Sequence, residues 1–401
     1  MLRTLPRLGY DPRLALIFWI VIALVGWQYR RVARLQKQLY GVALINPVRE
    51  TIVTTLQGVV GGLVGSILLV VVGISATDLG AGYLLLVAVL LSMIHPRLMC
   101  FSYAGAILAF SHLLFGWPRL SVPAVVALVA ILHIMESILI RFTGHQGAAA
   151  MPISTERGEL VGGFALQRFW AMPIFLLLLI QLPSGVPAGA IPMPDWWPLI
   201  PALDLAGAGE NGLFVLLPVA AALGYSDLAL TQWPRQRTRQ SAWQLGVYSV
   251  SLLLLAVASA FYPILHWAAA AASAFGHELV IKLGTRNQEG ARPVLSQPAM
   301  GVLVLDTLPQ SPARQAGLRS GDVIRAVDGE PVYSRDAVQS ALAQPGRREL
   351  TLRDGQRITV SGAVDLAGEL GLLLLPPAGG VYVQRRRGGL LQRWWRKWRR
   401  M

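Results

Sequence analysis

The sequence has 401 residues, of which 54% are hydrophobic and only 14% charged, and its mean hydropathy is +0.53. Soluble globular proteins carry about 25% charged residues, so the composition excludes an ordinary soluble enzyme and indicates that many apolar residues face lipid. The net charge is +14. In a membrane protein this excess is typical of cytoplasmic loops and contact with anionic headgroups, rather than of nucleic-acid binding. Because Cys100 is the only cysteine, a disulfide framework and a multi-cysteine metal site are excluded.

Apolar stretches that could span a membrane all precede residue 276, and a spanning helix needs about 20 residues. They lie at 14–29, 52–74, 79–94, 98–116, 122–140, 169–183, 212–226 and 244–275. We interpret the first as a retained anchor, because Arg30 and Arg31 follow it directly. The stretch 212–226 is short, and Pro263 divides the last one. The fold class predicted is therefore a multi-pass α-helical membrane protein with about seven or eight transmembrane helices.

The charges of the connections predict an orientation. Basic residues gather in 30–50, 141–168 and 227–243, whereas 185–211 has acidic residues and tryptophans but no basic residue. The positive-inside rule places the three basic connections in the cytoplasm, with the N-terminus and 185–211 outside. Eight single crossings would then leave the C-terminus outside as well.

The pattern changes after residue 276, where charges return and apolar runs become short. We predict three parts: a polytopic transmembrane domain (1–275), a soluble α+β domain (276–384, with its core at 300–361 and a strand at 370–375) and a basic tail (385–401). Strands are expected at 301–305, 323–327, 348–352 and 356–360, with helices at 313–316 and 334–344. Turns are expected at Asp328-Gly329 and Asp354-Gly355.

The order of these elements, with the motif SPARQAGLRSGDVIRAVDG at 311–329, resembles the bacterial PDZ domain. The resemblance implies that a peptide is bound as an extra strand between a sheet edge and the second helix. On that helix Val338 and Leu342 would face the peptide. Leu370, Gly371 and Leu372 resemble the loop whose amides bind a terminal carboxylate, although an ordinary core strand would look the same.

Membrane helices combined with a PDZ domain raise the possibility of an intramembrane zinc protease. His277 and Glu278 match part of a zinc helix, which needs a second histidine four residues after the first. Ile281 occupies that position. A serine-protease nucleophile segment is not found in the sequence either. We therefore expect a non-enzymatic chain with no catalytic residues, no metal site and no cofactor.

Two further groups lie within the apolar stretches. His133 and Glu136 share one face of a helix. Ionisable groups in a bilayer mark functional sites, but a hydrogen-bonded packing contact between helices would explain them as well. Glycines at 58, 61, 62 and 65 predict close helix packing rather than a pore.

The C-terminal tail combines tryptophans with basic residues. Its predicted membrane-surface residues are Arg393, Trp394, Trp395, Arg396, Lys397, Trp398 and Arg399. Each basic residue near an anionic leaflet contributes about 1 kcal/mol, which favours binding to anionic lipids and a cytoplasmic PDZ domain, although a solvated tail would have a similar composition. An odd number of crossings would reconcile this position with an N-terminus outside.

The overall layout resembles the MinJ family of cell-division topological determinants of Gram-positive bacteria. The resemblance rests on HPRLMCFSYAG (95–105), LHIMESILIRFTG (132–144), FGHELVIKLG (275–284) and the PDZ core. It implies a membrane adaptor that links a DivIVA-like polar scaffold to a MinD-like division inhibitor at poles and septa. The alternative is a PDZ-bearing transporter, or a degenerate membrane protease that binds substrate tails without cutting them.

Overall fold

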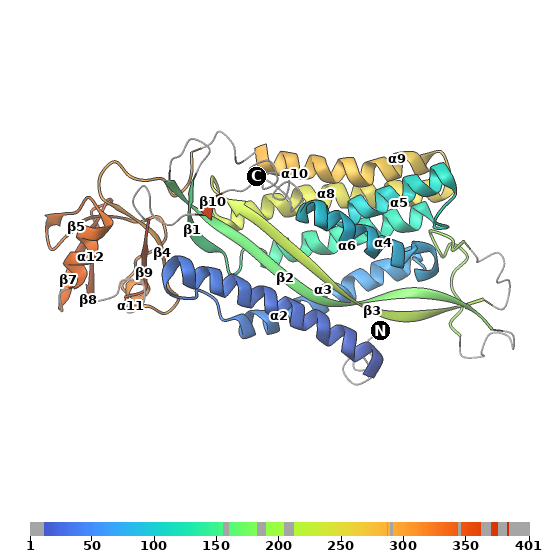
Figure 1. Ribbon diagram of the computed structural model, residues 1–401, viewed down its shortest axis with the longest axis horizontal. Coiled ribbons are helices and arrows are strands. Elements are labelled where there is room, and N and C mark those ends of the chain that lie inside the picture. Colours follow the sequence, from blue (N-terminus) through green and yellow to red (C-terminus); the bar gives the residue numbers. More distant parts are fainter. Residues whose placement is uncertain are drawn as a thin grey trace, which may run out of the picture.

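The structure is a computed structural model that describes residues 12–154, 160–182, 190–203, 212–286, 288, 292–343, 346–361, 370–375 and 383–384. Helices and a long β-hairpin form the larger part, and a small mixed α/β domain lies beyond one end of it (Figure 1). The helices are α2 (Pro12–Tyr40), α3 (Pro47–Val72), α4 (Ala81–Ile94), α5 (Phe101–Phe115), α6 (Val122–Thr143), α8 (Pro234–Phe261), α9 (Leu265–Ala271), α10 (His277–Arg286), α11 (Pro312–Gln315) and α12 (Arg335–Ala343). Short turns are the 3-10 helices η1 (Ala76–Leu79) and η2 (Pro96–Met99) and the π-helix η4 (Ala272–Gly276).

Among the described residues, five helices are long and apolar enough to cross a membrane: Leu16–Tyr40, Pro47–Val72, Ala76–Ile94, Val122–Thr143 and Pro234–Phe261. Helix α5 is apolar but shorter. The last predicted stretch is divided at Pro263 as expected, because α8 ends at Phe261 and α9 begins at Leu265. The structure thus confirms several long apolar helices.

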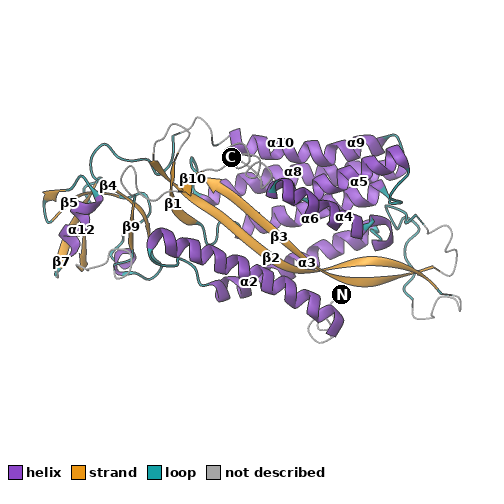
Figure 2. Ribbon diagram, in the orientation of Figure 1, coloured by secondary structure: helices purple, strands orange, loops and turns teal. Residues whose placement is uncertain are grey.

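Two of the predicted helices are wrong. The segments 169–183 and 212–226 belong to a β-hairpin of β2 (Leu160–Gln181) and β3 (Gly212–Ala229), which pair antiparallel from Phe164↔Ala229 to Gln181↔Gly212 (Figure 2). Hydropathy alone is the same for a helix and for a strand covered on both faces. Pro173 and Pro218 lie within these runs, and a proline inside a helix costs about 3 kcal/mol.

The edge of β2 that faces α2 and α3 does not lack hydrogen-bond partners. The Phe169 N–H donates to the Tyr29 hydroxyl (3.1 Å), and the Phe175 N–H donates to the Ser66 hydroxyl (2.8 Å). The Leu177 N–H donates to the Ile74 carbonyl (3.3 Å). Pro173, on the same edge, has no N–H to satisfy. Because an open strand edge is not tolerated in lipid, these helix groups let a hairpin lie within an apolar bundle.

The glycines of α3 allow this close packing, and they serve two partners. A Cβ at Gly58 would collide with the Ala171 carbonyl, and one at Gly62 would collide with the Pro173 carbonyl, so this face meets the backbone of β2. The predicted helix–helix packing is found on the other face, where Gly61 and Gly65 meet Leu139 and Met135 of α6.

The predicted basic connections gather at one end of the larger part. The Tyr40 hydroxyl, at the end of α2, donates to the carbonyl of Ala150 beyond α6. After β3, the Leu230 carbonyl accepts from Val294 (2.8 Å), which leads into the small domain. This end therefore carries the small domain as well (Figure 1). Residues 190–203 lie at the opposite end, where the Ile200 N–H bonds the carbonyl of Val72, the last residue of α3 (3.0 Å).

The strands form two sheets. One has the order β10-β1-β2-β3, with β1 (Ala149–Ser154) and β10 (Val383–Gln384) parallel; the other has the order β8-β7-β5-β4-β9, with β6 paired to β5. The strands of the second sheet are β4 (Val302–Thr307), β5 (Val323–Val327), β6 (Glu330–Pro331), β7 (Arg347–Leu352), β8 (Arg357–Ser361) and β9 (Leu372–Leu374). The predicted border at residue 276 falls inside a helical run that continues to Arg286.

Candidate functional site

In the small domain, the predicted helix cap and the predicted turn after β5 are both present. The Ser311 hydroxyl caps α11 by accepting from the Arg314 N–H (3.3 Å). Asp328 and Gly329 both have positive φ, as the tight turn after β5 requires. The expected strands and helices are all present within a few residues of their predicted bounds.

Strand β9 is the edge of this sheet. It pairs antiparallel with β4, and the described residues give it no second strand neighbour. Gly371, just before it, has a φ of 66°, and a Cβ there would collide with the Ser311 side chain. Its carbonyl accepts from the Leu308 N–H (2.8 Å). The loop 370–372 thus needs its glycine and opens the edge strand, which is the geometry required for β-strand addition of a peptide.

The groove helix differs from the prediction. Val338 and Leu342 of α12 are fully buried in the domain core, together with Leu370 and Leu372. They contact the core and do not face an open groove. The 3.6-residue period correctly identified the apolar side of the helix, but it could not tell whether core residues or a ligand would cover that side.

The pKa values of two carboxyl groups in the domain are shifted in opposite directions. Burial raises the pKa of Asp306 in β4. The exposed Asp328 accepts hydrogen bonds from the Arg348 guanidinium (2.8 Å) and the Glu349 N–H (2.8 Å), and these bonds lower its pKa. Because a buried carboxyl favours its neutral form, the raised pKa of Asp306 makes the stability of the domain depend on pH.

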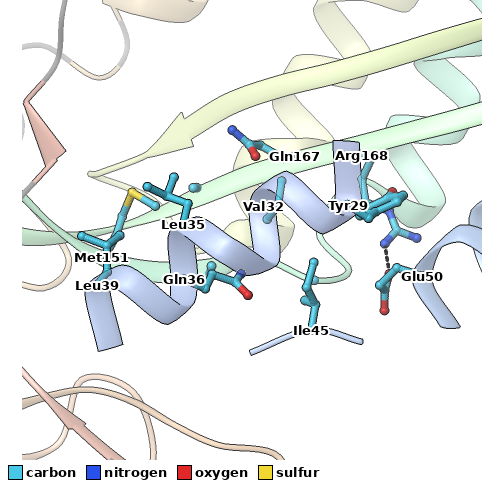
Figure 3. Close-up of a pocket in the computed structure, with 13 residues that line it drawn as sticks. Tyr29, Val32, Leu35, Gln36, Leu39, Ile45, Glu50, Met151, Gln167 and Arg168 are labelled. Atoms are coloured by element: carbon cyan, nitrogen blue, oxygen red, sulfur yellow. Dashed lines mark hydrogen bonds and ion pairs between the residues drawn. The ribbon is translucent and has the colours of Figure 1, made fainter. Parts of the chain in front are cut away.

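A small pocket of about 30 Å³ lies between α2 and the sheet, beside a buried ion pair (Figure 3). Arg168 of β2 is only 1% exposed and bonds the Glu50 carboxylate of α3 at 2.5 Å. Its guanidinium also donates to Gln57 (3.0 Å) and Gln146 (3.3 Å). Arg168 belongs to the basic segment 141–168 that is predicted to orient the chain, but its charge is neutralised inside the protein.

Arg237 is neutralised in the same way. It is buried near the start of α8 and forms two hydrogen bonds with Asp227 of β3 (2.8 and 3.0 Å). The ion pair holds α8 against the hairpin, and Ser241 adds a third bond to the same carboxylate (3.0 Å). The positive charge that can orient the chain is therefore carried by the remaining basic residues of these segments.

A polar cluster that sequence reasoning missed lies inside the helical part. Cys100 precedes α5, His133 lies in the middle of α6 and His277 begins α10, and their ligand atoms all lie within 4.8 Å of one another. Cys100 Sγ is 3.2 Å from His133 Nε2 and 3.6 Å from His277 Nε2. Cysteine and histidine are the residue types that bind zinc and related metals.

The remaining predicted residues are not part of this cluster. Glu136 is partly buried on α6, and the hydrogen bonds of His133 go to other groups, namely Cys100 and the Val129 carbonyl. Glu278 is bound by Arg97 (3.0 Å) and Tyr103 (2.9 Å). The predicted membrane-surface segment, Arg393 to Arg399, lies outside the described residues.

Similarity to known proteins supports the PDZ domain and extends over most of the chain. A PDZ domain family model matches residues 304–353. Over 346 residues the chain is 23% identical to the cell division topological determinant MinJ of Bacillus subtilis (strain 168), a match that covers 81% of this chain and 82% of that protein. The chain is thus similar to MinJ over most of its length. The similarity extends far beyond the PDZ match and so includes the membrane part.

Shorter matches connect the chain to proteases. The putative serine protease HhoA of Synechocystis is 40% identical over 60 residues, 15% of each chain. The periplasmic serine endoprotease DegP of Escherichia coli (strain K12) is 34% identical over 84 residues, 20% of this chain and 18% of that protein. These matches are about as long as a single PDZ domain, whereas the MinJ match covers 81% of this chain.

Proposed function

We propose that the chain is a non-enzymatic membrane adaptor for division-site selection, which recruits proteins through its PDZ domain. One observation carries this proposal: the similarity to a cell division topological determinant covers more than four fifths of both chains. In the described part of the chain, the outer edge of β9, which follows Gly371, has no strand neighbour and offers a place for a peptide strand. By analogy with MinJ-type adaptors, a DivIVA-like scaffold and a MinD-like protein are the proposed partners.

The PDZ domain is proposed to lie in the cytoplasm. It lies at the same end as the basic residues that close α2 and those that open α8, and positive charge marks the cytoplasmic end of membrane helices. The hairpin of β2 and β3 crosses the bundle and returns, so the chain reaches this end without the eight helical crossings of the sequence prediction. A reporter fused to residue 401 that is active only outside the cell would contradict this orientation.

Localisation tests the division role. A fluorescent fusion of the full chain is expected to gather at poles and septa. An even distribution over the cell membrane would refute the division-site proposal, while leaving the membrane fold unaffected.

Peptide binding is tested with the full chain in detergent micelles and a set of peptides that end in apolar residues. Each peptide is compared with its C-terminally amidated form, which keeps the side chains but removes the terminal carboxylate. If the loop 370–372 binds that carboxylate, amidation weakens binding at least tenfold. Equal binding of both forms would assign the peptide an internal mode of strand addition and refute the carboxylate-loop role.

A further inference from the structure

Cys100, His133 and His277 bring together three metal-binding side chains from segments that are far apart in the sequence. We propose that these three residues bind a zinc ion inside the membrane part of the chain. The site is separate from the PDZ domain and does not depend on the division role proposed above.

The distances fit the proposal. Zinc binds thiolate sulfur at about 2.3 Å and imidazole nitrogen at about 2.0 Å, so in a tetrahedral site the sulfur lies about 3.5 Å from each nitrogen. The observed separations of Cys100 Sγ from the two Nε2 atoms are 3.2 and 3.6 Å. These separations match the sulfur–nitrogen distance of a tetrahedral zinc site, and the three ligand atoms all lie within 4.8 Å of one another.

The partners of Nδ1 favour, in both imidazoles, the tautomer whose unprotonated Nε2 faces the sulfur. His133 Nδ1 lies 2.7 Å from the Val129 carbonyl, which only accepts hydrogen bonds, so Nδ1 carries the proton. The Tyr103 hydroxyl donates to the Glu278 carboxylate (2.9 Å) and is therefore free to accept from His277 Nδ1 (3.3 Å). Zinc-binding histidines are oriented by hydrogen bonds of this kind from the other ring nitrogen.

With the proton on Nδ1 of both rings, the three groups cannot all be hydrogen-bonded to one another. A thiol has one proton and can donate to one Nε2 atom, so the second nitrogen faces the sulfur without a proton between them. A dication with a thiolate at Cys100 satisfies all three atoms. The Ser102 N–H, which points at Cys100 Sγ (3.4 Å) at the start of α5, also favours negative charge on the sulfur.

The location suggests what the ion would do. It would join the start of α5, the middle of α6 and the start of α10, and α10 leads toward the PDZ domain. Three protein ligands leave one position of a tetrahedral zinc for water or a small anion. The carboxylate next to His277, on Glu278, is already bound by Arg97 and Tyr103, which favours a zinc that fixes α10 to the bundle over a hydrolytic zinc.

The test uses the full chain in detergent micelles, stripped with a chelator and then titrated with zinc chloride. We expect one zinc per chain, and slower alkylation of Cys100, the only thiol, when zinc is present. Cobalt in place of zinc is expected to give a thiolate-to-cobalt charge-transfer band and the intense visible bands of a tetrahedral site. Each of the substitutions Cys100→Ala, His133→Ala and His277→Ala is expected to abolish stoichiometric binding.

Two further variants keep the test decisive if a ligand variant fails to fold. Tyr103→Phe keeps every ligand but removes the hydrogen-bond partner of His277 Nδ1, and we expect 10- to 100-fold weaker zinc binding, as for other lost outer-shell bonds. His112→Ala is the matched control, because His112 lies on α5 and bonds the Pro118 carbonyl instead; it is expected to bind zinc as wild type does. Less than one zinc per wild-type chain, no charge-transfer band, or full binding by all three alanine variants would overturn the proposal.

Discussion

The ion pair between Arg168 and Glu50 gives a quantitative test of how the hairpin is held against α3. Glu50→Gln keeps the shape of the side chain but removes its charge. The guanidinium, which is 1% exposed, would then have only neutral amide oxygens as partners, at position 50, Gln57 and Gln146, and its Nε already has no hydrogen-bond partner among the described residues. Removing one member of a buried ion pair costs about 3 to 5 kcal/mol, so we expect the unfolding equilibrium constant to rise at least a hundredfold.

The free energy of unfolding can be measured by titrating the chain in mixed micelles with a denaturing detergent and following tryptophan fluorescence. The fully buried Trp170 next to this ion pair reports on the region directly, since its Nε1 lies 3.4 Å from the Gln57 amide oxygen. Arg49→Gln, which removes an exposed charge beside Glu50 in the same helix, is the matched control and should change stability by no more than about 0.5 kcal/mol.

A double variant separates the loss of attraction from the buried charge that remains. Glu50→Gln combined with Arg168→Met removes both charges, and replacing a buried pair with neutral or apolar side chains is often close to neutral. We therefore expect the double variant to regain most of the stability lost in Glu50→Gln alone. If Glu50→Gln costs no more than Arg49→Gln, the buried pair does not hold the hairpin as inferred.

Three other changes follow from the geometry. Gly62→Val places a side chain against the Pro173 carbonyl and should destabilise the chain by about 1 to 3 kcal/mol in the same titration, whereas Gly82→Val, at a position with open space around it, should not. Gly371→Ala forces an L-residue into positive φ and should lower the melting temperature of the PDZ domain and its peptide affinity together; an unchanged melting temperature would contradict the clash. Asp306→Asn should raise the PDZ melting temperature at neutral pH but not at acidic pH. The folded state holds the Asp306 proton more tightly than the unfolded state, so the stability of the native domain falls as pH rises from the ordinary carboxyl pKa through the raised one; parallel curves for both proteins would refute this.

The PDZ domain could be predicted almost residue by residue, because its signals are local. A capping serine at Ser311, a turn at Asp328-Gly329 and short alternating strands each act within a few residues. The hairpin could not be predicted from hydropathy, since a strand covered on both faces is apolar throughout, like a buried helix. The useful signal was Pro173, which fits a strand edge and disfavours a helix.

The cluster of Cys100, His133 and His277 could not be predicted from the sequence for a different reason. Cys100 is 33 residues from His133 and 177 from His277, so no spacing rule connects them. Only the packing of α5, α6 and α10 brings the three side chains together. Along its own helix, His277 has Ile281 at the position where a zinc helix needs its second histidine.

The pairing of β10 with β1 affects how the PDZ domain is attached. The chain enters this domain next to β2, where Leu295 bridges Gly162, and leaves it at β10, which pairs with Ile153 and Ser154 of the same sheet. The domain is therefore anchored at both ends rather than carried on a single flexible linker. Two attachments limit its rotation, so a partner bound at β9 would be held in a set direction relative to the membrane.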